Sequence, residues 1–233
     1  MTYRVFFVNI FYVFIKQWEE TMEVLLDPRT VNSRKVLAGL KLIGADYSIK
    51  KFDYFQAEQK SPDFVAVNPN ASFPALKDGD FILWESNAIL QYAADKVGNT
   101  SAYPTDLKTR ADINRWLLWE SSSWFGSCYK YLVENCVKPL LGDVTDTNVL
   151  ANEEENFHKL AGILDSRLEG SAFLCGNEPT IADVAIAAPM HLHAWAKLPL
   201  TDHPNLVQWM TNKIENSSWW KDTHVGEGFT LPE

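Results

Sequence analysis

Two adjacent polar residues, Glu85 and Ser86, stand where the periodicity of the chain changes. Residues 81–84 form a short apolar run typical of a strand, whereas Ile89 and Ala93 recur at helical spacing. Ser86 has the residue type and position of an N-cap, so the pair is predicted at a helix N-terminus. Free backbone N–H groups and the positive end of the helix dipole can bind a ligand carboxylate there, and a hydroxyl adds one more donor.

The dipeptide Phe73-Pro74 opens a short strand that the sequence predicts over residues 73–77, before a tight turn at Asp78-Gly79. A proline is tolerated in a sheet at an edge, a strand start or a bulge. Two interpretations are open. The proline is an ordinary trans residue at a strand start, or the bond is cis and leaves the backbone of Phe73 free to pair with a peptide-like ligand.

Three short polar side chains, Thr30, Asn32 and Ser33, lie between a predicted strand at residues 23–26 and a predicted helix at residues 32–43. Residues of these types routinely cap helices by accepting hydrogen bonds from free N–H groups. Taken alone, they are expected to cap this helix.

The elements that must position these residues follow one order from Met22 onward: strand, helix, strand, helix, hairpin, helix. The second strand is predicted at residues 47–53 and the second helix at residues 61–67. The pattern is that of an α/β domain over residues 22–98. A polar linker at residues 99–106 follows, and residues 107–233 predict an all-helical domain. Thr180 and Asp183 predict a capping box there, with a structural role.

The bulk composition is that of an ordinary globular protein of 233 residues, 46% hydrophobic, with a net charge of -9. No basic cluster offsets this charge, which argues against a nucleic-acid or anionic-membrane partner. The Glu153-Glu154-Glu155 run predicts a solvated helix face. The three cysteines have neither metal spacing nor a Cys-x-x-Cys motif, which predicts buried thiols and a reducing, cytoplasmic location. His191 and His193, two positions apart on a predicted helix, point away from each other, so no metal site is predicted.

The first 21 residues contain an apolar run that is shorter than the about 20 residues needed to cross a bilayer. They also lack a small-residue cleavage site. We interpret residues 1–21 as the product of an upstream start codon, with a membrane or partner anchor as the alternative.

The run NPNASFPALKDGDFILWESNAILQYAADK resembles the glutathione-binding core of the cytosolic glutathione transferases, and the resemblance extends from about Met22 to near Trp220. It implies a thioredoxin-like N-terminal domain and an all-helical C-terminal domain. It also implies a cis bond at Phe73-Pro74, and that Glu85 and Ser86 hold the γ-glutamyl end of glutathione. Gln59 and Lys60 resemble the segment that meets the glycine carboxylate.

In the serine-type members, which include bacterial enzymes, the thiol-activating segment resembles Ser-x-Asn-x-x-Lys-Val, and Thr30 stands where the serine would be. Thr30, Asn32 and Ser33 are therefore three catalytic candidates. A free thiol with a pKa of about 8.5 is only a few per cent thiolate at pH 7, so one of them is expected to stabilise the thiolate. Because glutathione is anionic, the pocket also needs cations, for which Lys60, Arg29 and Arg34 are candidates.

The early helices of the second domain wall the electrophile pocket in this family. Four polar or aromatic residues are candidates for that wall: Trp116, Trp119, Ser123 and Tyr129. An aromatic stripe is also the usual content of a helical core.

The sequence thus predicts a glutathione transferase that uses glutathione as co-substrate, without a metal, to attack a small hydrophobic electrophile. The resemblance further implies a homodimer. Two alternatives are open: a glutathione-dependent peroxidase, dehalogenase or isomerase on the same fold, or a non-catalytic binding protein that has kept the fold.

Overall fold

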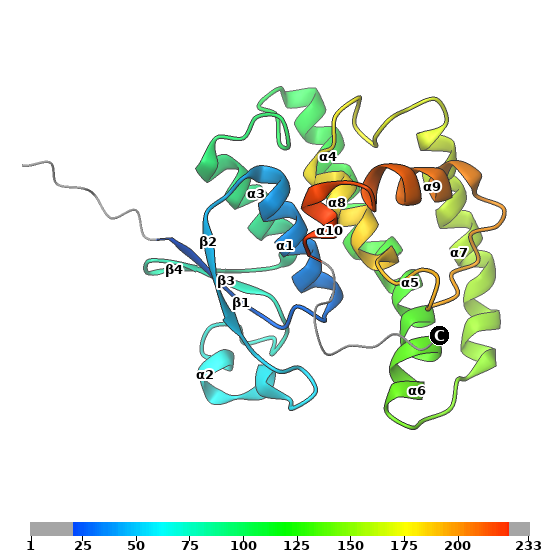
Figure 1. Cartoon of the computed structure of the whole chain (residues 1–233), viewed down its shortest axis with the longest axis horizontal. Coiled ribbons are helices and arrows are strands. Elements are labelled where there is room, and N and C mark those ends of the chain that lie inside the picture. Colours follow the sequence, from blue (N-terminus) through cyan, green and yellow to red (C-terminus); the bar gives the residue numbers. More distant parts are fainter. Residues whose placement is uncertain (1–20, 224–233) are drawn as a thin grey trace, which may run out of the picture.

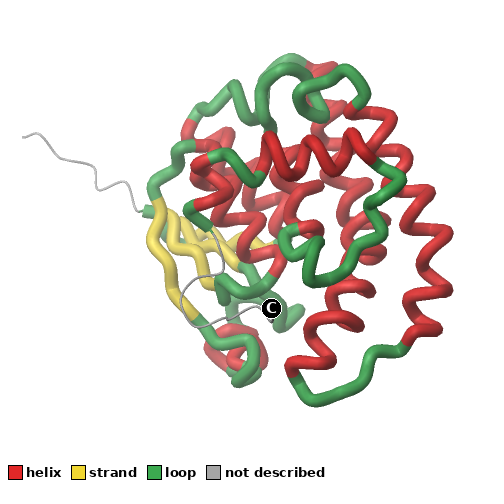
Figure 2. Tube along the Cα trace, turned by 45° about the vertical axis from the view of Figure 1, so that its right-hand side comes forward, coloured by secondary structure: helices red, strands yellow, loops and turns green. Residues whose placement is uncertain are grey.

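The computed structural model describes residues 21–223, which form a small sheet domain followed by an all-helical domain (Figure 1). The strands gather at one side of the molecule and helices make up the rest (Figure 2). This confirms the predicted combination of an α/β N-terminal domain and an all-α C-terminal domain. The predicted extension lies, except for Thr21, outside the described residues.

The sheet consists of β1 (Met22–Leu26), β2 (Tyr47–Lys51), β3 (Ala75–Asp78) and β4 (Phe81–Trp84), in the order β2-β1-β3-β4. β1 pairs with β2 in parallel, and β3 pairs with both β1 and β4 in antiparallel fashion. A parallel pair requires a crossover connection, which α1 (Val31–Ile43) supplies. The loop from β1 to α1 therefore lies at one edge of the domain, where Thr30 is found.

The hairpin between β3 and β4 has a two-residue loop, but the loop is Gly79-Asp80 and not the predicted Asp78-Gly79. Asp78 stays in the strand opposite Phe81, and its carboxylate accepts hydrogen bonds from Tyr92 and Lys96 on α3 (Ser86–Val97). Gly79 takes φ 58°, a positive value that glycine adopts without a steric penalty. The anchored side chain of Asp78 thus moves the turn by one residue.

Helix α1 is buried along almost its whole length, between the sheet and the helices α3, α8 and α10. Gly39 allows this close packing: a Cβ atom there would lie 2.2 Å from a methyl carbon of Leu90 on α3. The remaining helical segments of the first domain are short. They are a 3-10 turn at Glu58–Lys60 and α2 at Pro62–Val65, shorter than the predicted 61–67.

The second domain begins after residues 98–106, which contain no helix or strand. Its helices are α4 (Leu107–Trp119), α5 (Phe125–Leu132), α6 (Lys138–Leu140), α7 (Thr147–Leu168), α8 (Ile181–Ala187), α9 (Pro204–Trp209) and α10 (Ser218–Lys221). Three π-helical stretches, Glu120–Trp124, Val133–Val137 and Met210–Ile214, continue α4, α5 and α9, and a 3-10 turn at Ala188–Met190 continues α8. Within residues 21–223, no helix is both long enough and apolar enough to cross a membrane.

The solvated face predicted for Glu153-Glu154-Glu155 is right for Glu154 and Glu155, which are exposed, and wrong for Glu153. Glu153 is buried and accepts hydrogen bonds from Ser127, Lys130 and Asn156. The prediction for the two histidines is also wrong. His191 and His193 do not lie on an α-helix, because the helical hydrogen bonding ends at the 3-10 turn around Pro189. Among the described residues, no three His, Cys, Asp or Glu side chains are grouped as metal ligands.

The predicted capping box at the start of α8 is confirmed. Thr180 accepts a hydrogen bond from the backbone N–H of Ala182, and Asp183 accepts one from the backbone N–H of Thr180. The other oxygen of Asp183 accepts from the N–H of Leu174, 2.8 Å away. Asp183 therefore ties the incoming loop to the helix, and its burial raises its pKa to about 6 in spite of these hydrogen bonds.

This raised pKa predicts how Asp183 affects stability with pH. The native state holds the proton more tightly than the unfolded chain, so the favourable contribution is present below about pH 4 and is lost as the pH rises to about 6. We expect the free energy of unfolding of the wild type, relative to Asp183→Asn, to decrease over this interval and to level off above it. Urea titrations at several pH values measure this. Ser61→Ala, which removes the N-cap of α2 in the other domain, is the control and should cost about 1 kcal/mol at every pH.

Candidate functional site

The N-terminus of α3 presents Glu85 and Ser86 as predicted, but with different roles. Glu85 is the N-cap, with φ 73° and ψ 111°, and Ser86 is the first residue of the helix. The expectation that Ser86 is the N-cap is therefore wrong. A positive φ at a residue other than glycine costs free energy and is typical of functional sites, because the surrounding structure must enforce it. Here it turns the chain sharply from β4 into α3.

A buried ion pair lies behind Ser86. Lys35 on α1 is 1% exposed, and its Nζ atom donates to Glu120 Oε2 at 2.8 Å and to Ser86 Oγ at 3.2 Å. Asn87 donates to the same carboxylate oxygen at 3.0 Å, and Ser86 Oγ lies 3.4 Å from Asn32 Oδ1. The hydroxyl of Ser86 is thus held by residues of α1 and, through Lys35, by the second domain.

Lys35, Asn87 and Glu120 were not predicted from the sequence. A signal was present, since Lys35 and Glu120 each occur within a helical pattern that is otherwise rich in apolar or aromatic residues. A charge in such a position needs a buried partner. The sequence alone does not give the distance between residues 85 positions apart.

The bond between Phe73 and Pro74 is cis, which confirms the second of the two interpretations of this dipeptide. The ring of Phe73 packs edge-on against Phe64 with ring centroids 4.6 Å apart, and also contacts Phe52. The backbone N–H and C=O of Phe73 form no hydrogen bond with other described residues. They are available to a ligand that lies along this edge in an extended conformation.

The loop from β1 to α1 brings the three catalytic candidates to the helix N-terminus. Thr30 is the N-cap of α1, but its side chain makes no capping hydrogen bond. Its hydroxyl lies 3.0 Å from the carbonyl oxygen of Asp27 and 2.6 Å from the hydroxyl of Ser33. Ser33 is fully buried, whereas Thr30 and Asn32 are partly exposed. The expectation that these residues cap the helix through their side chains is not met at Thr30.

Gln59 and Lys60 lie in the 3-10 turn that precedes α2. The side chain of Gln59 is buried, yet its Oε1 atom has no hydrogen-bond partner in the described part of the chain. Lys60 is exposed, and no carboxylate of the described residues forms an ion pair with it. A buried polar atom without a partner is costly, so Gln59 is suited to accept an N–H group of a ligand.

The two arginines proposed as pocket cations have other partners. Arg29 pairs with both Asp27 and Asp53. Arg34 is buried, lies over the ring of Trp220 at 4.2 Å and donates to the carbonyl oxygen of His191. Burial lowers the pKa of Arg34 to about 10. Of the three expected cations, Lys60 alone has no ion-pair or cation-π partner among the described residues.

The four candidates for the electrophile wall lie on α4, on α5 and on the π-helical stretch between them. Trp116 is buried, and Trp119 stacks on Trp124 at 6.2 Å. Tyr129 is 38% exposed. Its neighbour Tyr54 comes from the loop after β2, and burial together with this contact raises the pKa of Tyr129. Tyr129 thus lies where the two domains meet, and the assignment of all four residues to the electrophile wall stays a prediction.

The cysteines offer no reactive thiolate at neutral pH. Cys128 and Cys136 are buried, and Cys175 is partly so. Burial raises the pKa of all three thiols, to about 12 for Cys136 and Cys175. A nucleophilic thiolate at this site must therefore come from a ligand.

Comparisons with known proteins agree with this geometry. The family profile of the glutathione S-transferase N-terminal domain matches residues 22–95, and that of the C-terminal domain matches residues 136–216. A probable glutathione S-transferase from rice is 30% identical over 190 residues, which cover 80% of this chain and 88% of the rice protein. The chain belongs to the glutathione S-transferase family. Glutathione S-transferase D7 from Drosophila melanogaster is 29% identical over 83% of this chain and 84% of its own length.

Solved glutathione S-transferases share the same fold. Glutathione S-transferase I from maize, in complex with an atrazine glutathione conjugate, superposes with a TM-score of 0.77 at 27% identity, over 88% of this chain and 97% of the maize chain. Glutathione S-transferase III in its apo form gives a TM-score of 0.79 at 28% identity, over 91% and 100% of the two chains. The rice, maize and Drosophila relatives are plant and insect proteins, so the predicted bacterial subtype receives no support from them.

The buried ion pair in this glutathione S-transferase predicts an asymmetric response to mutation. Glu120→Gln leaves the buried ammonium of Lys35 without a counter-charge, which should cost about 3 kcal/mol of unfolding free energy. The double variant Lys35→Met/Glu120→Leu should recover most of this loss, since no buried charge remains. Urea denaturation of the single and double variants measures both values. Equal losses in the two would contradict the interpretation that the unpaired charge is responsible.

Proposed function

We propose that this protein is a glutathione transferase that binds glutathione between its two helix N-termini and transfers the thiolate to an apolar electrophile. The observation that carries the proposal is the backbone of Phe73, which forms no hydrogen bond with other described residues. It lies in the same domain as the Ser86 hydroxyl at the start of α3 and the Thr30 hydroxyl at the start of α1. The family membership and the maize enzyme solved with a glutathione conjugate support this assignment.

Three parts of the site would hold three parts of the tripeptide. The γ-glutamyl end lies at Glu85 and Ser86, where free N–H groups and the dipole of α3 stabilise its carboxylate. The free backbone groups of Phe73 pair with the cysteinyl residue in the manner of an added strand. The glycine end lies at Gln59 and Lys60, where the ammonium group provides a point charge.

Thr30 is the residue that we assign to activation of the thiol. Thr30 is partly exposed, whereas Ser33 is fully buried, and their hydroxyl oxygens lie 2.6 Å apart. In the structure the Thr30 hydroxyl donates to Ser33 Oγ and to the carbonyl oxygen of Asp27. With glutathione bound, it would turn its proton to the sulfur and accept a hydrogen bond from Ser33 instead. Lowering the thiol pKa by about 2 units requires roughly 2.7 kcal/mol of preferential thiolate stabilisation. One hydrogen bond to a charged acceptor together with the dipole of α1 supplies energy of this order.

The reaction itself needs no further protein nucleophile. The thiolate donates an electron pair to an electrophilic carbon, a carbon–sulfur bond forms, and the leaving group departs with the electrons of its own bond. In the maize relative, the conjugated electrophile is atrazine. The exposed ring of Tyr129, stacked on Phe125 at 5.2 Å, supplies an apolar wall of the kind that an aromatic electrophile would contact.

We also keep the homodimer and the cytoplasmic location as proposals. The edge strand β4 exposes three large apolar side chains, Phe81, Ile82 and Trp84, each at least 40% exposed. Exposed apolar side chains gathered on one edge strand are typical of a surface that a second copy covers. The buried, unpaired cysteines agree with a reducing compartment.

The assignment of Thr30 is tested by titrating the thiol of bound glutathione. The ultraviolet absorbance of the thiolate, followed against pH, should give a lowered pKa with the wild type. Thr30→Ala should return it to about 8.5, and Thr30→Ser should keep it low. Ser33→Ala should cause a smaller rise, because it removes only the donor behind Thr30. An unshifted pKa with tight binding in the wild type would instead favour a ligand-binding role, and a failure to bind would contradict the proposed function.

The assignment of Ser86 is tested by glutathione affinity. Ser86→Ala removes one donor to the γ-glutamyl carboxylate, so the KM for glutathione should rise about tenfold while the pKa of the bound thiol stays nearly constant. Ser48→Ala, an exposed serine on β2 of the same domain, is the matched control and should leave the KM unchanged. Equal KM values in the two variants would remove Ser86 from the site.

A further inference from the structure

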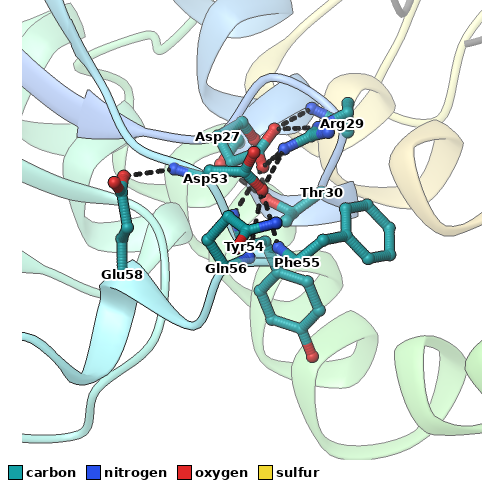
Figure 3. A network of polar contacts seen from close by, with 9 residues as sticks. Asp27, Arg29, Thr30, Asp53, Tyr54, Phe55, Gln56 and Glu58 are labelled. Carbon is teal, nitrogen blue, oxygen red and sulfur yellow. Dashed lines mark hydrogen bonds and ion pairs between the residues drawn. The ribbon is translucent and has the colours of Figure 1, made fainter.

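Two loops that carry opposite parts of the glutathione site are joined by one arginine (Figure 3). The first loop follows β1 and contains Asp27, Arg29 and Thr30. The second follows β2, contains Asp53 and ends at Gln59 and Lys60. The Nη2 atom of Arg29 lies 2.6 Å from Asp27 Oδ2 and 2.6 Å from Asp53 Oδ1. Arg29 therefore bridges the two loops directly.

Asp27 is the buried end of this bridge, with an exposed fraction of 1%. Its carboxylate accepts from the backbone N–H and the Nε atom of Arg29, both at 2.9 Å. It also accepts from the backbone N–H of Tyr54 in the second loop, at 2.8 Å. A buried carboxylate is tolerated only when it is paired and hydrogen-bonded, and Arg29 supplies the counter-charge.

Asp53 is the exposed end. Its Oδ1 atom accepts from the backbone N–H groups of Phe55 and Gln56, at 2.8 and 3.3 Å. Its own backbone N–H donates to Glu58, one residue before Gln59. The guanidinium carbon of Arg29 lies 4.8 Å from the centre of the Phe55 ring. The turn that leads to the glycine-end residues is thus organised around a carboxylate that Arg29 holds.

The same bridge reaches the thiol-activating residue. Both the backbone N–H and the hydroxyl of Thr30 lie close to the carbonyl oxygen of Asp27, at 3.1 and 3.0 Å. The position of Asp27 therefore fixes that of Thr30. Hydrogen bonds with Asp27 and Asp53 raise the pKa of Arg29, so its charge is permanent. Without Arg29, two carboxylates would remain near a site that must stabilise an anion.

We infer that Arg29 is a positioning residue that couples activation of the glutathione thiol to binding of the glycine end of the same molecule. The inference rests on the proposed function. Arg29 would act through two neighbours: Asp27 carries the effect to Thr30, and Asp53 carries it to the loop of Gln59 and Lys60. This bridge was not foreseen in the sequence, where Arg29 was expected to contact glutathione itself.

The experiment compares Arg29→Gln, Arg29→Lys and Asp53→Asn in steady-state conjugation of glutathione to chlorodinitrobenzene and in the thiol titration. For Arg29→Gln we expect the KM for glutathione to rise about fivefold and the pKa of the bound thiol to rise by about one unit. Arg29→Lys keeps the charge but loses the fork that spans both carboxylates. In Arg29→Lys the thiol pKa should therefore be close to the wild-type value, whereas the KM for glutathione should stay raised.

Asp53→Asn breaks the bridge at one end only. It also keeps the test valid if the Arg29 variants do not fold, because Asp53 is exposed and asparagine keeps an acceptor oxygen for the loop. We expect it to raise the KM with almost no change in the thiol pKa. Arg110→Gln is the matched control. Arg110 likewise pairs with an aspartate, donates to a backbone carbonyl and lies over an aromatic ring, but on α4 at the start of the second domain.

Two results would overturn the inference. One is an Arg29→Gln enzyme whose KM and thiol pKa equal those of the wild type. The other is a pair of Arg29→Gln and Arg110→Gln enzymes that lose activity equally and in proportion to their lost thermal stability. A wild-type protein that binds no glutathione, or that leaves the thiol pKa unchanged, would contradict the proposed function itself, and the role of Arg29 that rests on it would be overturned with it.

Discussion

The charge of Lys35 is buried at the point where the sheet domain meets the helical domain, and much of the site depends on it. A buried ammonium group loses its hydration and is tolerated only beside a counter-charge with good geometry. Glu120 provides that charge from the second domain, and Ser86 accepts a further hydrogen bond from the same ammonium. The ion pair therefore sets the distance between the domains and the position of the hydroxyl that is assigned to glutathione. The receptor that we propose for the γ-glutamyl end therefore depends on both domains.

The protein carries a net charge of -9, yet it is expected to bind an anion and to stabilise a thiolate. The structure resolves this conflict locally. The arginines near the site already have partners within the protein. Arg29 forms ion pairs with two aspartates, and Arg34 lies over the ring of Trp220. The positive potential that remains comes from two helix N-termini and from Lys60. Because helix dipoles act only within about one turn of the helix end, they favour an anion at the site without changing the acidic surface elsewhere.

Short-range signals in the sequence predicted the elements and most of the site. The strands, the helix start near Ser86 and the capping box at Thr180 depend on neighbouring residues, and the cis bond at Phe73-Pro74 followed from a family resemblance in a short motif. Some failures were local: Ser86 was taken for the N-cap, and the hairpin loop was placed one residue early. Others were of another kind. Glu153 was assigned to solvent, and Lys35 was overlooked, because their partners lie far away in the sequence. The pairing of such groups depends on tertiary packing, which no local pattern contains.

A four-residue repeat of buried positions runs through the first helices of the second domain. From Trp116 to Cys136, every fourth residue is buried: Trp116, Glu120, Trp124, Cys128, Leu132 and Cys136. In a regular α-helix, with 3.6 residues per turn, each step of four residues advances about 40° beyond a full turn, so five steps would rotate the buried face by about 200°. The wider turns at Glu120–Trp124 and Val133–Val137 compensate for this rotation. They keep Glu120 facing α1 while the indole of Trp124 fills the core of its own domain. A strict four-residue repeat of core positions therefore indicates π-helical turns, and the first of these turns begins at the residue that pairs with Lys35.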